Sequence, residues 1–483
     1  MSTLETTTQQ THALKKELRL RDLVLMQILL VVGISWCGIP ARQGSSHTWF
    51  WILGIFAIFI PQAMVVQYCS RIWPLEGGVY QWTKFVFGPG AAFISAWNFA
   101  IWALLAVANL GIFWASSLSY AFGARAAWIA DSKWMITGLN LGLFAFILLV
   151  CIPGFHIGKW ISHFGSAVTV VIAGLLAVLL FYHPHATLAH PHHAPQAPIG
   201  FMFPALTLLS LNLFSKVCNS ALSGLEQVAV FAGETKNPGR AIMRSAWIGA
   251  PITALIYIAM TAALLEYTPS SQIDLAAPIP QVLAAAFSGG NGTAAFLGLL
   301  LGRIAIFLLA VGLAAQYSIV IAETSRLPLV AGWDNLVPGW FTQLHPKYRT
   351  PARSIIFIVV CAVLVGNISL VGAGHEEALQ LINSGSVMIY GIYYVLFFSV
   401  PLAAAYRVSL RNLPRPGWGL KIAATSGVLV SLLGMAFAVY PIIDVPSKLL
   451  FGIKVGVATL IVNIIGVLLY WSGTRNQNKK ATA

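Results

Sequence analysis

Charged residues are scarce in this chain. Only 9% of its 483 residues are Asp, Glu, Lys or Arg, whereas hydrophobic residues make up 58%. Soluble domains carry about 25% charged residues. The composition therefore excludes an ordinary soluble domain and indicates an integral membrane protein whose outer surface faces lipid.

Negative charge is scarcest: 14 acidic residues face 28 basic ones, giving a net charge of +14. That excess could indicate a nucleic-acid partner, but its distribution argues against one. If both termini are cytoplasmic, 21 of the 28 cationic residues lie on the cytoplasmic side and five on the outer side, namely Arg42, Arg125, Lys133, Lys448 and Lys454. This is the positive-inside pattern. We expect a multi-pass protein of the inner (plasma) membrane that contacts anionic lipid headgroups.

Signals for cofactors and metals are also sparse. No phosphate-binding loop of the Walker type is found, and the five cysteines have neither zinc-type nor disulfide-type spacing. Residues 183–200 hold five histidines among prolines and alanines. This tract could capture a metal ion, but its spacing matches no defined metal geometry, so a solvated connector is the plainer interpretation. We expect no cofactor.

Long apolar runs are what the chain has in abundance. A spanning helix needs about 20 residues, and twelve segments meet that length, with no cleavage signal after the first. Residues 1–20 and 473–483 are then short cytoplasmic tails around one membrane domain, 21–472. The predicted spans are 22–45, 49–72, 90–118, 135–153, 158–182, 204–232, 244–266, 293–322, 354–372, 378–405, 420–440 and 449–472.

The sixth span is interrupted by polar residues. Its apolar start gives way to Ser215, Lys216, Asn219, Ser220 and Glu226 before apolar residues resume. Lipid offers no hydrogen-bond partners, so such residues at mid-depth must face a cavity or other protein. A helix broken near the bilayer midplane is typical of a transporter binding site.

The first span is interrupted in the same way. Gly33, Ser35, Gly38 and Pro40 lie near its middle, where proline removes a helical donor and glycine weakens the helix. A simple kink or a close helix contact is the alternative. If the first ten spans form two repeats of five, spans one and six are equivalent, and the second repeat is inverted relative to the first.

These features bring the chain close to a known family. The stretch Gly33–Gly38, the loop Pro74-Leu-Glu-Gly-Gly-Val-Tyr80, the segment Ser223–Arg240 and the segment Ser325–Pro338 occur in the right order on twelve spans. Together they resemble amino-acid permeases of the amino acid–polyamine–organocation superfamily over nearly the whole chain.

The resemblance implies an all-α integral membrane fold of the LeuT type. Ten helices form two inverted repeats, helices one and six are broken, and two C-terminal helices follow. It implies a secondary transporter, not an enzyme, that moves an amino acid or related amine such as a polyamine by proton symport, sodium symport or exchange. The expected partners are that small molecule, H⁺ or Na⁺, and the bilayer.

The resemblance also implies where the substrate binds. Its carboxylate would meet freed backbone N–H groups of the first break, and its ammonium would meet freed carbonyl groups, mostly of helix six. The implied substrate-binding residues are Ser35, Trp36, Cys37, Gly38, Asn219, Ser220, Ala221, Leu222 and Ser223. We expect Cys37 and Cys218 to line this cavity and to react faster with thiol reagents than Cys69, Cys151 or Cys361.

Four further residues are candidates for coupling or gating: Glu226, Lys216, Arg303 and Tyr68. Glu226 is either a protonatable group facing the permeation path or a structural hydrogen-bond acceptor. Lys216 could compensate a substrate carboxylate, pair with a carboxylate elsewhere or extend outward to the membrane surface. A buried Arg303 would need a partner, whereas we expect Glu323 at the interface beside Arg326.

The chain departs from the family at some of these places. Tyr68 stands where relatives often have a glutamate, and helix five has no lysine between Trp160 and Phe181. The bulky Trp36 lies at the first break.

Competing functions remain open. A transport-inactive sensor of the same fold would share this sequence pattern. A membrane enzyme would need a cluster of catalytic side chains, and a channel would need repeated pore motifs; neither signal is found.

Overall fold

The computed structural model describes residues 17–75, 77–181, 199–200, 202–287, 292–330, 336, 339–371, 374–404, 406 and 414–482. This part of the chain is helical, apart from turns, connecting segments and an isolated bridge between Leu18 and Thr235. The histidines of residues 183–193 lie outside it.

Ten helical stretches in the described residues are long and apolar enough to cross a membrane. They match ten of the twelve predicted spans, which confirms a multi-pass, all-α membrane protein. They are Gly44–Ile72, Pro89–Phe122, Lys133–Cys151, Trp160–Leu179, Pro238–Tyr267, Ala295–Leu329, Ala352–Ser369, His375–Ala404, Trp418–Ala438 and Lys448–Arg475. The first and sixth predicted spans are absent from this set because their helices are short pieces.

In the first span, α2 covers Leu20–Val31 and is followed by Val32 and Gly33, which belong to no helix. A 3-10 turn, η1 (Ile34–Cys37), and a short helix, α3 (Gly38–Ala41), come next. The chain therefore leaves the α-helical path at the predicted glycine.

In the sixth span, α13 (Leu208–Lys216) loosens into a π-helical turn, η5 (Val217–Ala221). Residues 222–226 are not helical, and Gly224 has φ of +108°, a conformation that glycine adopts without strain. The 3-10 segment η6 (Gln227–Glu234) completes the span. The turns η1 and η5 pack against each other.

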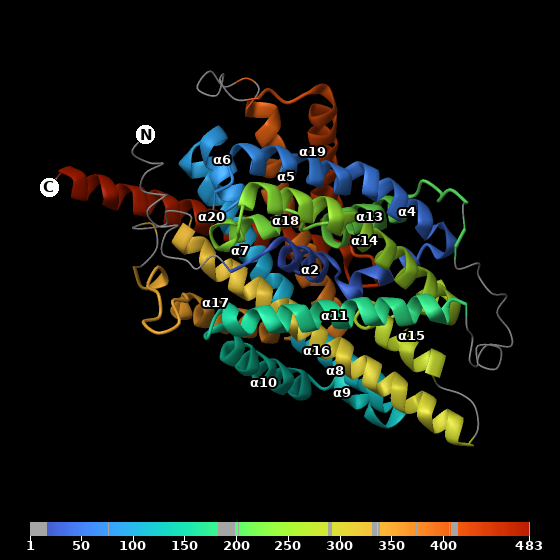
Figure 1. Ribbon diagram of the computed structural model, residues 1–483. Coiled ribbons are helices and arrows are strands. Elements are labelled where there is room, and N and C mark those ends of the chain that lie inside the picture. The colour runs from blue at the N-terminus through green and yellow to red at the C-terminus, as the bar shows by residue number, and fades with distance from the viewer. Residues whose placement is uncertain are drawn as a thin grey trace.

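The remaining helices surround these two segments. Figure 1 shows α2 near the centre, with α14 on one side of it and α11 on the other, and α2 packs against both. The helices are α4 (His47–Gly54), the π-turn η3 (Ile55–Phe59), α5 (Ile60–Ile72), α6 (Val79–Phe87), α7 (Pro89–Ala108), α8 (Leu110–Phe122), α9 (Trp128–Asp131), α10 (Lys133–Cys151), α11 (Phe155–Leu179), α14 (Pro238–Tyr267), α15 (Pro278–Phe287), α16 (Gly292–Val330), α17 (Ala352–Ser369), α18 (His375–Ala404), α19 (Trp418–Ala438) and α20 (Lys448–Thr482).

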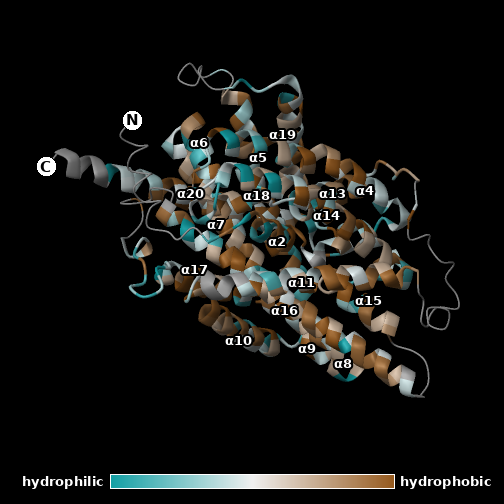
Figure 2. Cartoon of the chain, viewed as in Figure 1, coloured by the Kyte–Doolittle hydropathy of each residue, from teal (hydrophilic) through white to brown (hydrophobic). Residues whose placement is uncertain are grey.

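The outer helices present apolar side chains to their surroundings. Figure 2 shows strongly hydrophobic colouring on α10, where Phe146 and Leu149 are 56% and 74% exposed. On α14, Leu255 is 69% exposed. Apolar residues on such a surface are expected when hydrocarbon, not water, surrounds the helices.

Glycines allow the closest helix contacts. On α19, a methyl group added at Gly427 would overlap the ring of Phe398 on α18, and Phe398 is fully buried. Small residues at such contacts let two backbones approach, which is the main source of helix association in membranes.

We therefore expect Gly427→Ala to destabilise the protein by about 1–3 kcal/mol, the usual cost of overpacking a core. The measurement is the midpoint of thermal unfolding in detergent. Gly138→Ala on α10 is the matched control, because open space surrounds Gly138. Equal midpoints for the two variants would contradict the close contact.

Candidate functional site

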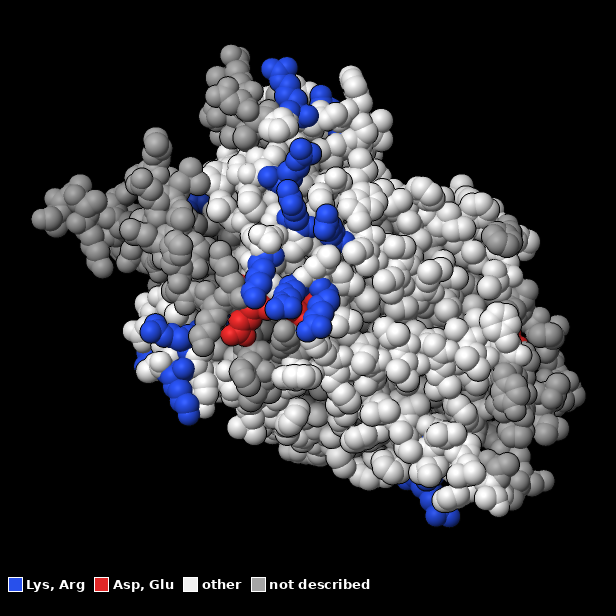
Figure 3. All heavy atoms as spheres, in the orientation of Figure 1, with Lys and Arg blue, Asp and Glu red and all other residues white. Residues whose placement is uncertain are grey.

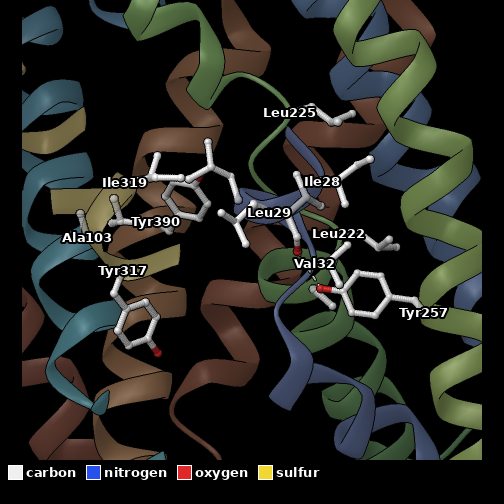
Figure 4. Close-up of a cluster of buried hydrophobic side chains, with 14 of the residues drawn as sticks. Ile28, Leu29, Val32, Ala103, Leu222, Leu225, Tyr257, Tyr317, Ile319 and Tyr390 are labelled. Carbon is white, nitrogen blue, oxygen red and sulfur yellow. Dashed lines mark hydrogen bonds between the residues drawn. The ribbon is translucent and has the colours of Figure 1, made fainter. Parts of the chain in front are cut away.

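The break in the first span is held by side chains from α14 and α16. The backbone N–H of Gly33 donates to the hydroxyl of Tyr257 (2.9 Å), and that hydroxyl donates to the carbonyl of Val31 (2.7 Å). Gln316 donates its amide N–H to the carbonyl of Leu29 (2.6 Å). Figure 4 shows Tyr257 reaching toward the chain near Val32, with Tyr317 and Tyr390 on the opposite side.

Tyr257 is itself fixed in place. Its ring stacks on Trp51, with 4.6 Å between ring centroids, and the Trp51 indole N–H donates to Thr261 on the next turn of α14 (3.1 Å). A rigid tyrosine therefore adds two buried hydrogen bonds to the Gly33 N–H and the Val31 carbonyl, which also bond each other (2.8 Å).

The break in the sixth span is held by α2, α5 and α18. The amide of Gln62 donates to the Leu222 carbonyl (2.6 Å), and the amide of Gln27 donates to the Leu225 carbonyl (2.8 Å). The N–H of Gly224 donates to the hydroxyl of Tyr394 (2.8 Å). Each break thus depends on amide and hydroxyl side chains of neighbouring helices.

Glu226 lies at the end of this second break and is fully buried. The hydroxyl of Tyr390 donates to its Oε1 (2.5 Å), and the hydroxyl of Tyr394 lies 3.3 Å from its Oε2. Tyr390 also accepts a hydrogen bond from the amide of Gln227 (3.0 Å). The salt bridges found among the described residues do not include Glu226.

A cavity opens between the two breaks. The space inside it that is open to the centre of a water molecule is about 80 Å³. Its wall is built mainly from the first and sixth spans, α7, α16 and α18. The polar lining consists of amides and hydroxyls: Asn109, Asn219, Ser220, Ser223, Gln227, Gln316, Tyr317, Gln380, Asn383 and Ser386.

Aromatic and apolar side chains complete the cavity. Trp102 and Trp36 lie on its wall, and Leu275, from the segment that leads into α15, lies among its lining residues. No charged side chain lines it within the described part of the chain.

The predicted substrate-binding residues divide into two groups. The residues Trp36, Asn219, Ser220 and Ser223 belong to the cavity wall, although the Asn219 amide N–H donates to the Val430 carbonyl on α19 (3.1 Å). Those of Cys37, Ala221 and Leu222 are fully buried elsewhere, and Gly38 packs toward Pro278. Ser35 belongs to η1, and its side chain lies outside the described part.

The expectation that Cys37 and Cys218 line the cavity is wrong for this conformation. Both are fully buried and absent from its lining, whereas Cys361 is partly exposed. Cys218 Sγ faces α4, lying 3.5 Å from where a side chain on Gly54 would begin. Because η5 remains a helical turn, Cys218 and the cavity-lining Ser220 point to different sides of it.

Lys216 does not extend to the membrane surface. It is 3% exposed, and its Nζ donates to the hydroxyl of Ser384 on α18 (3.0 Å). The salt bridges of the described residues do not include it, and it is not part of the cavity wall.

The expectations for Arg303 and Glu323 are both wrong. Arg303 is exposed, and Glu323 is completely buried. The two lie 20 residues apart on one helix, which at about 100° per residue places them about 200° apart around its axis. The sequence shows how far each residue lies from the end of α16, but not which side of the helix faces the protein interior.

Tyr68 lies on α5 away from the cavity wall, and its hydroxyl donates to the Pro414 carbonyl (2.9 Å). This contact joins α5 to the segment that leads into α19. It gives Tyr68 a packing role in this conformation.

Sequence reasoning missed the residues that hold the breaks: Gln27, Gln62, Tyr257, Gln316, Tyr390 and Tyr394. The three glutamines carried a signal, because an amide inside an apolar span needs a partner. The tyrosines carried little signal, since tyrosine is common in membrane helices and at their ends.

The chain is similar to known proteins in both sequence and fold. A family model described as amino acid permease matches residues 23–470. The crystal structure of MhsT in complex with L-phenylalanine has a TM-score of 0.58 and 14% sequence identity, covering 93% of this chain and 98% of that one. At this identity the likeness concerns the fold alone, and it supports a LeuT-type arrangement.

Three curated relatives extend the comparison. An uncharacterized transporter of Legionella pneumophila is 24% identical over 449 residues, covering 90% of this chain and 92% of the relative. The branched-chain amino acid permease BcaP of Bacillus subtilis is 24% identical over 400 residues, covering 78% and 79%. The probable agmatine/putrescine antiporter AguD of Lactococcus lactis is 21% identical over 470 residues, covering 92% and 93%.

The contribution of the Tyr257 hydroxyl to stabilising the first break can be tested. We expect Tyr257→Phe to destabilise the protein by about 1–3 kcal/mol, because it removes two buried hydrogen bonds and leaves the Gly33 N–H and the Val31 carbonyl only their bond to each other (2.8 Å). Thermal unfolding in detergent is the measurement, and Tyr440→Phe, at a residue that is 57% exposed, is the control. If both variants melt together, the hydroxyl of Tyr257 does not stabilise the break.

Proposed function

The chain belongs to the amino acid permease family, within the amino acid–polyamine–organocation superfamily, and from that premise we propose that it is a secondary active transporter of amino acids or related amines working by alternating access. The observation that carries the proposal is a cavity bounded by two interrupted spans. Transporter sites are typically built in this way.

In this proposal the two interrupted spans are discontinuous transmembrane helices, which brings the number of spans to twelve. The backbone of residues 35–38 meets the substrate carboxylate, and the carbonyls of residues 219–223 meet its ammonium group. Regular α-helix ends at both places, which frees backbone groups for a ligand, although the Leu222 carbonyl already accepts from Gln62 (2.6 Å).

The wall of the cavity favours a substrate without net charge. Amides and hydroxyls such as those of Gln380, Asn383 and Ser386 can bond either end of a zwitterion. A diamine would bring a second cation against a neutral wall, and burying a charge without a partner is costly. Between the substrate classes named for the relatives, we therefore favour amino acids over diamines.

Buried contacts around Glu234 hold one end of the molecule together, and we take this as the closed end of the proposed transport path. Arg326 Nε donates to Glu234 Oε1 (2.8 Å), and both side chains are buried. Beside this pair, the N–H of Leu18 donates to the Glu234 carbonyl (3.0 Å). In alternating access, opening the cavity to this end requires breaking these contacts.

We assign the closed end to the cytoplasm. Exposed cations near it include Arg71, Lys236, Arg240 and Arg244. Figure 3 shows Lys and Arg side chains gathered in a band on one part of the visible face, with little charge over the rest. Such a band fits the cytoplasmic membrane surface, and it supports the proposal that both termini are cytoplasmic.

The first test of this function is uptake by proteoliposomes. We expect the reconstituted protein to accumulate or exchange at least one neutral amino acid, with diamines transported less well. Liposomes without protein are the control. Binding without transport by a folded protein would favour a sensor of the same fold, and chemical conversion of the substrate would favour an enzyme.

Coupling is the second element of the proposal. We propose that Glu226 binds the coupling proton, because it is buried, lacks a cation partner among the described residues and bonds to a tyrosine that reaches the cavity wall through Gln227. A proton is then the coupling ion, with sodium the alternative.

Glu226→Gln imitates the protonated carboxyl with little change of shape. We expect it to flatten the pH dependence of uptake while exchange of substrate continues, because exchange needs no net proton movement. The measurement is initial uptake across a pH series, beside counterflow at constant pH. A wild-type pH profile in the variant would assign Glu226 to structure alone.

A further inference from the structure

A second buried carboxylate has no role in the site so far. Glu323 on α16 is fully buried, and neither of its carboxylate oxygens has a hydrogen-bond partner among the described residues. It also takes part in none of the ion pairs found there. A charged carboxylate in such a place is costly unless something binds it.

The two buried carboxylates are neighbours. The segment η6 begins at the residue after Glu226, and α16, which carries Glu323, packs against η6. Glu226 lies within electrostatic range of Glu323. Tyr393 on α18 lies within range of both. Two nearby carboxylates repel each other when both are charged. Ionising both at once is therefore costly.

Two basic side chains on neighbouring helices of the described chain are already paired. On α16, Arg326 is engaged with Glu234 (2.8 Å). Where α2 meets α11, His163 is engaged with Asp22 (3.0 Å).

Further neighbours are neutral. Tyrosines 390, 393 and 394 come from α18, Gln27 from α2 and Gln62 from α5. On α10, the thiol of Cys151 donates to the Ser318 carbonyl (3.3 Å).

We propose that Glu226 and Glu323 together form the proton-binding site of the transport cycle, sharing one exchangeable proton between two carboxylates. This inference rests on the proposed function and adds Glu323 to it. In each cycle one proton from the aqueous phase adds to a carboxylate of the pair, and the same carboxyl group later releases it to the other side.

The geometry favours a proton over a sodium ion. The Tyr390 hydroxyl directs its hydrogen at Glu226 Oε1, and the Tyr394 hydroxyl stands beside Oε2. A metal ion would have to occupy the space that these donors fill. A proton can instead bind Glu323, whose two oxygens have no hydrogen-bond partner among the described residues.

The pair is connected to the substrate cavity. Tyr390 bonds Glu226 and accepts from Gln227, and its ring stacks on Trp102 with 4.2 Å between centroids. Gln227 and Trp102 both line the cavity. Protonating the pair weakens the acceptor that fixes Tyr390, so two parts of the cavity wall respond to the proton.

The experiment compares wild type with Glu323→Gln, Glu323→Asp, Glu226→Gln and the Glu226→Gln/Glu323→Gln double variant in proteoliposomes. Glu376→Gln is the matched control, because Glu376 is an exposed carboxylate. Two quantities are measured for a transported amino acid: accumulation driven by an imposed pH gradient, and counterflow exchange without one. A sodium gradient replaces the pH gradient in a parallel arm.

We expect Glu323→Gln to reduce accumulation driven by the pH gradient by about tenfold, within the usual range of coupling between two sites. Exchange should stay close to wild type, and Glu323→Asp should restore accumulation with a shifted pH profile. The double variant should lose no more than either single variant, because the two carboxylates act as one unit.

Other outcomes separate the possible failures. If wild type transports no substrate, the proposed function fails. If wild type responds to the pH gradient and Glu323→Gln does so equally, this inference fails while the function stands. Accumulation driven by sodium but not by protons overturns the proton site. If both Glu323 variants lose exchange as well as accumulation, Glu323 is a structural residue, and the proposed proton site is also overturned.

Discussion

The structure depends on satisfying backbone groups where two helices stop in a lipid environment. A membrane helix normally pairs these groups internally, and hydrocarbon offers no substitute. Here Tyr257 and Gln316 provide the partners for the first break, and Gln27 and Gln62 provide them for the sixth. The breaks persist because α5, α14 and α16, together with α2 of the first span, supply these groups.

The same hydrogen bonds shape the cavity. Gln316 both binds the backbone of α2 and lines the cavity wall, and Gln227 both lines the wall and donates to Tyr390. A side chain that holds a break therefore also forms part of the substrate's surroundings. Movement of a helix that carries such a side chain changes the break and the cavity together, which is what alternating access requires.

Buried charged side chains lie outside the cavity wall in the described residues. The cavity wall is neutral in the described residues, whereas carboxylates lie just beyond it at Glu226 and Glu323. The buried cation Lys216 bonds only a hydroxyl, that of Ser384, among the described residues. In the proposed transport cycle, the substrate and the proton would therefore bind at separate places that are joined through Tyr390.

The sequence by itself determined the fold class and the position of both interruptions. Length and hydropathy predicted twelve spans, ten of which match long apolar helices in the described residues. The glycine at residue 33 and the polar run from Ser215 to Glu226 indicated where α-helix would stop. These are local properties, since apolar length and glycine or polar content act within one segment. The family resemblance, confirmed by the match over residues 23–470, followed from the same stretches.

Only the tertiary structure decided which side chains face the cavity. Ser220 and Cys218 lie two residues apart in one turn, yet one lines the wall and the other packs toward α4. Arg303 and Glu323 lie on one helix, yet only Glu323 is buried. The direction of a side chain depends on the rotation of its helix and on the neighbours around it, and in an apolar helix these are set by packing between segments far apart in the chain.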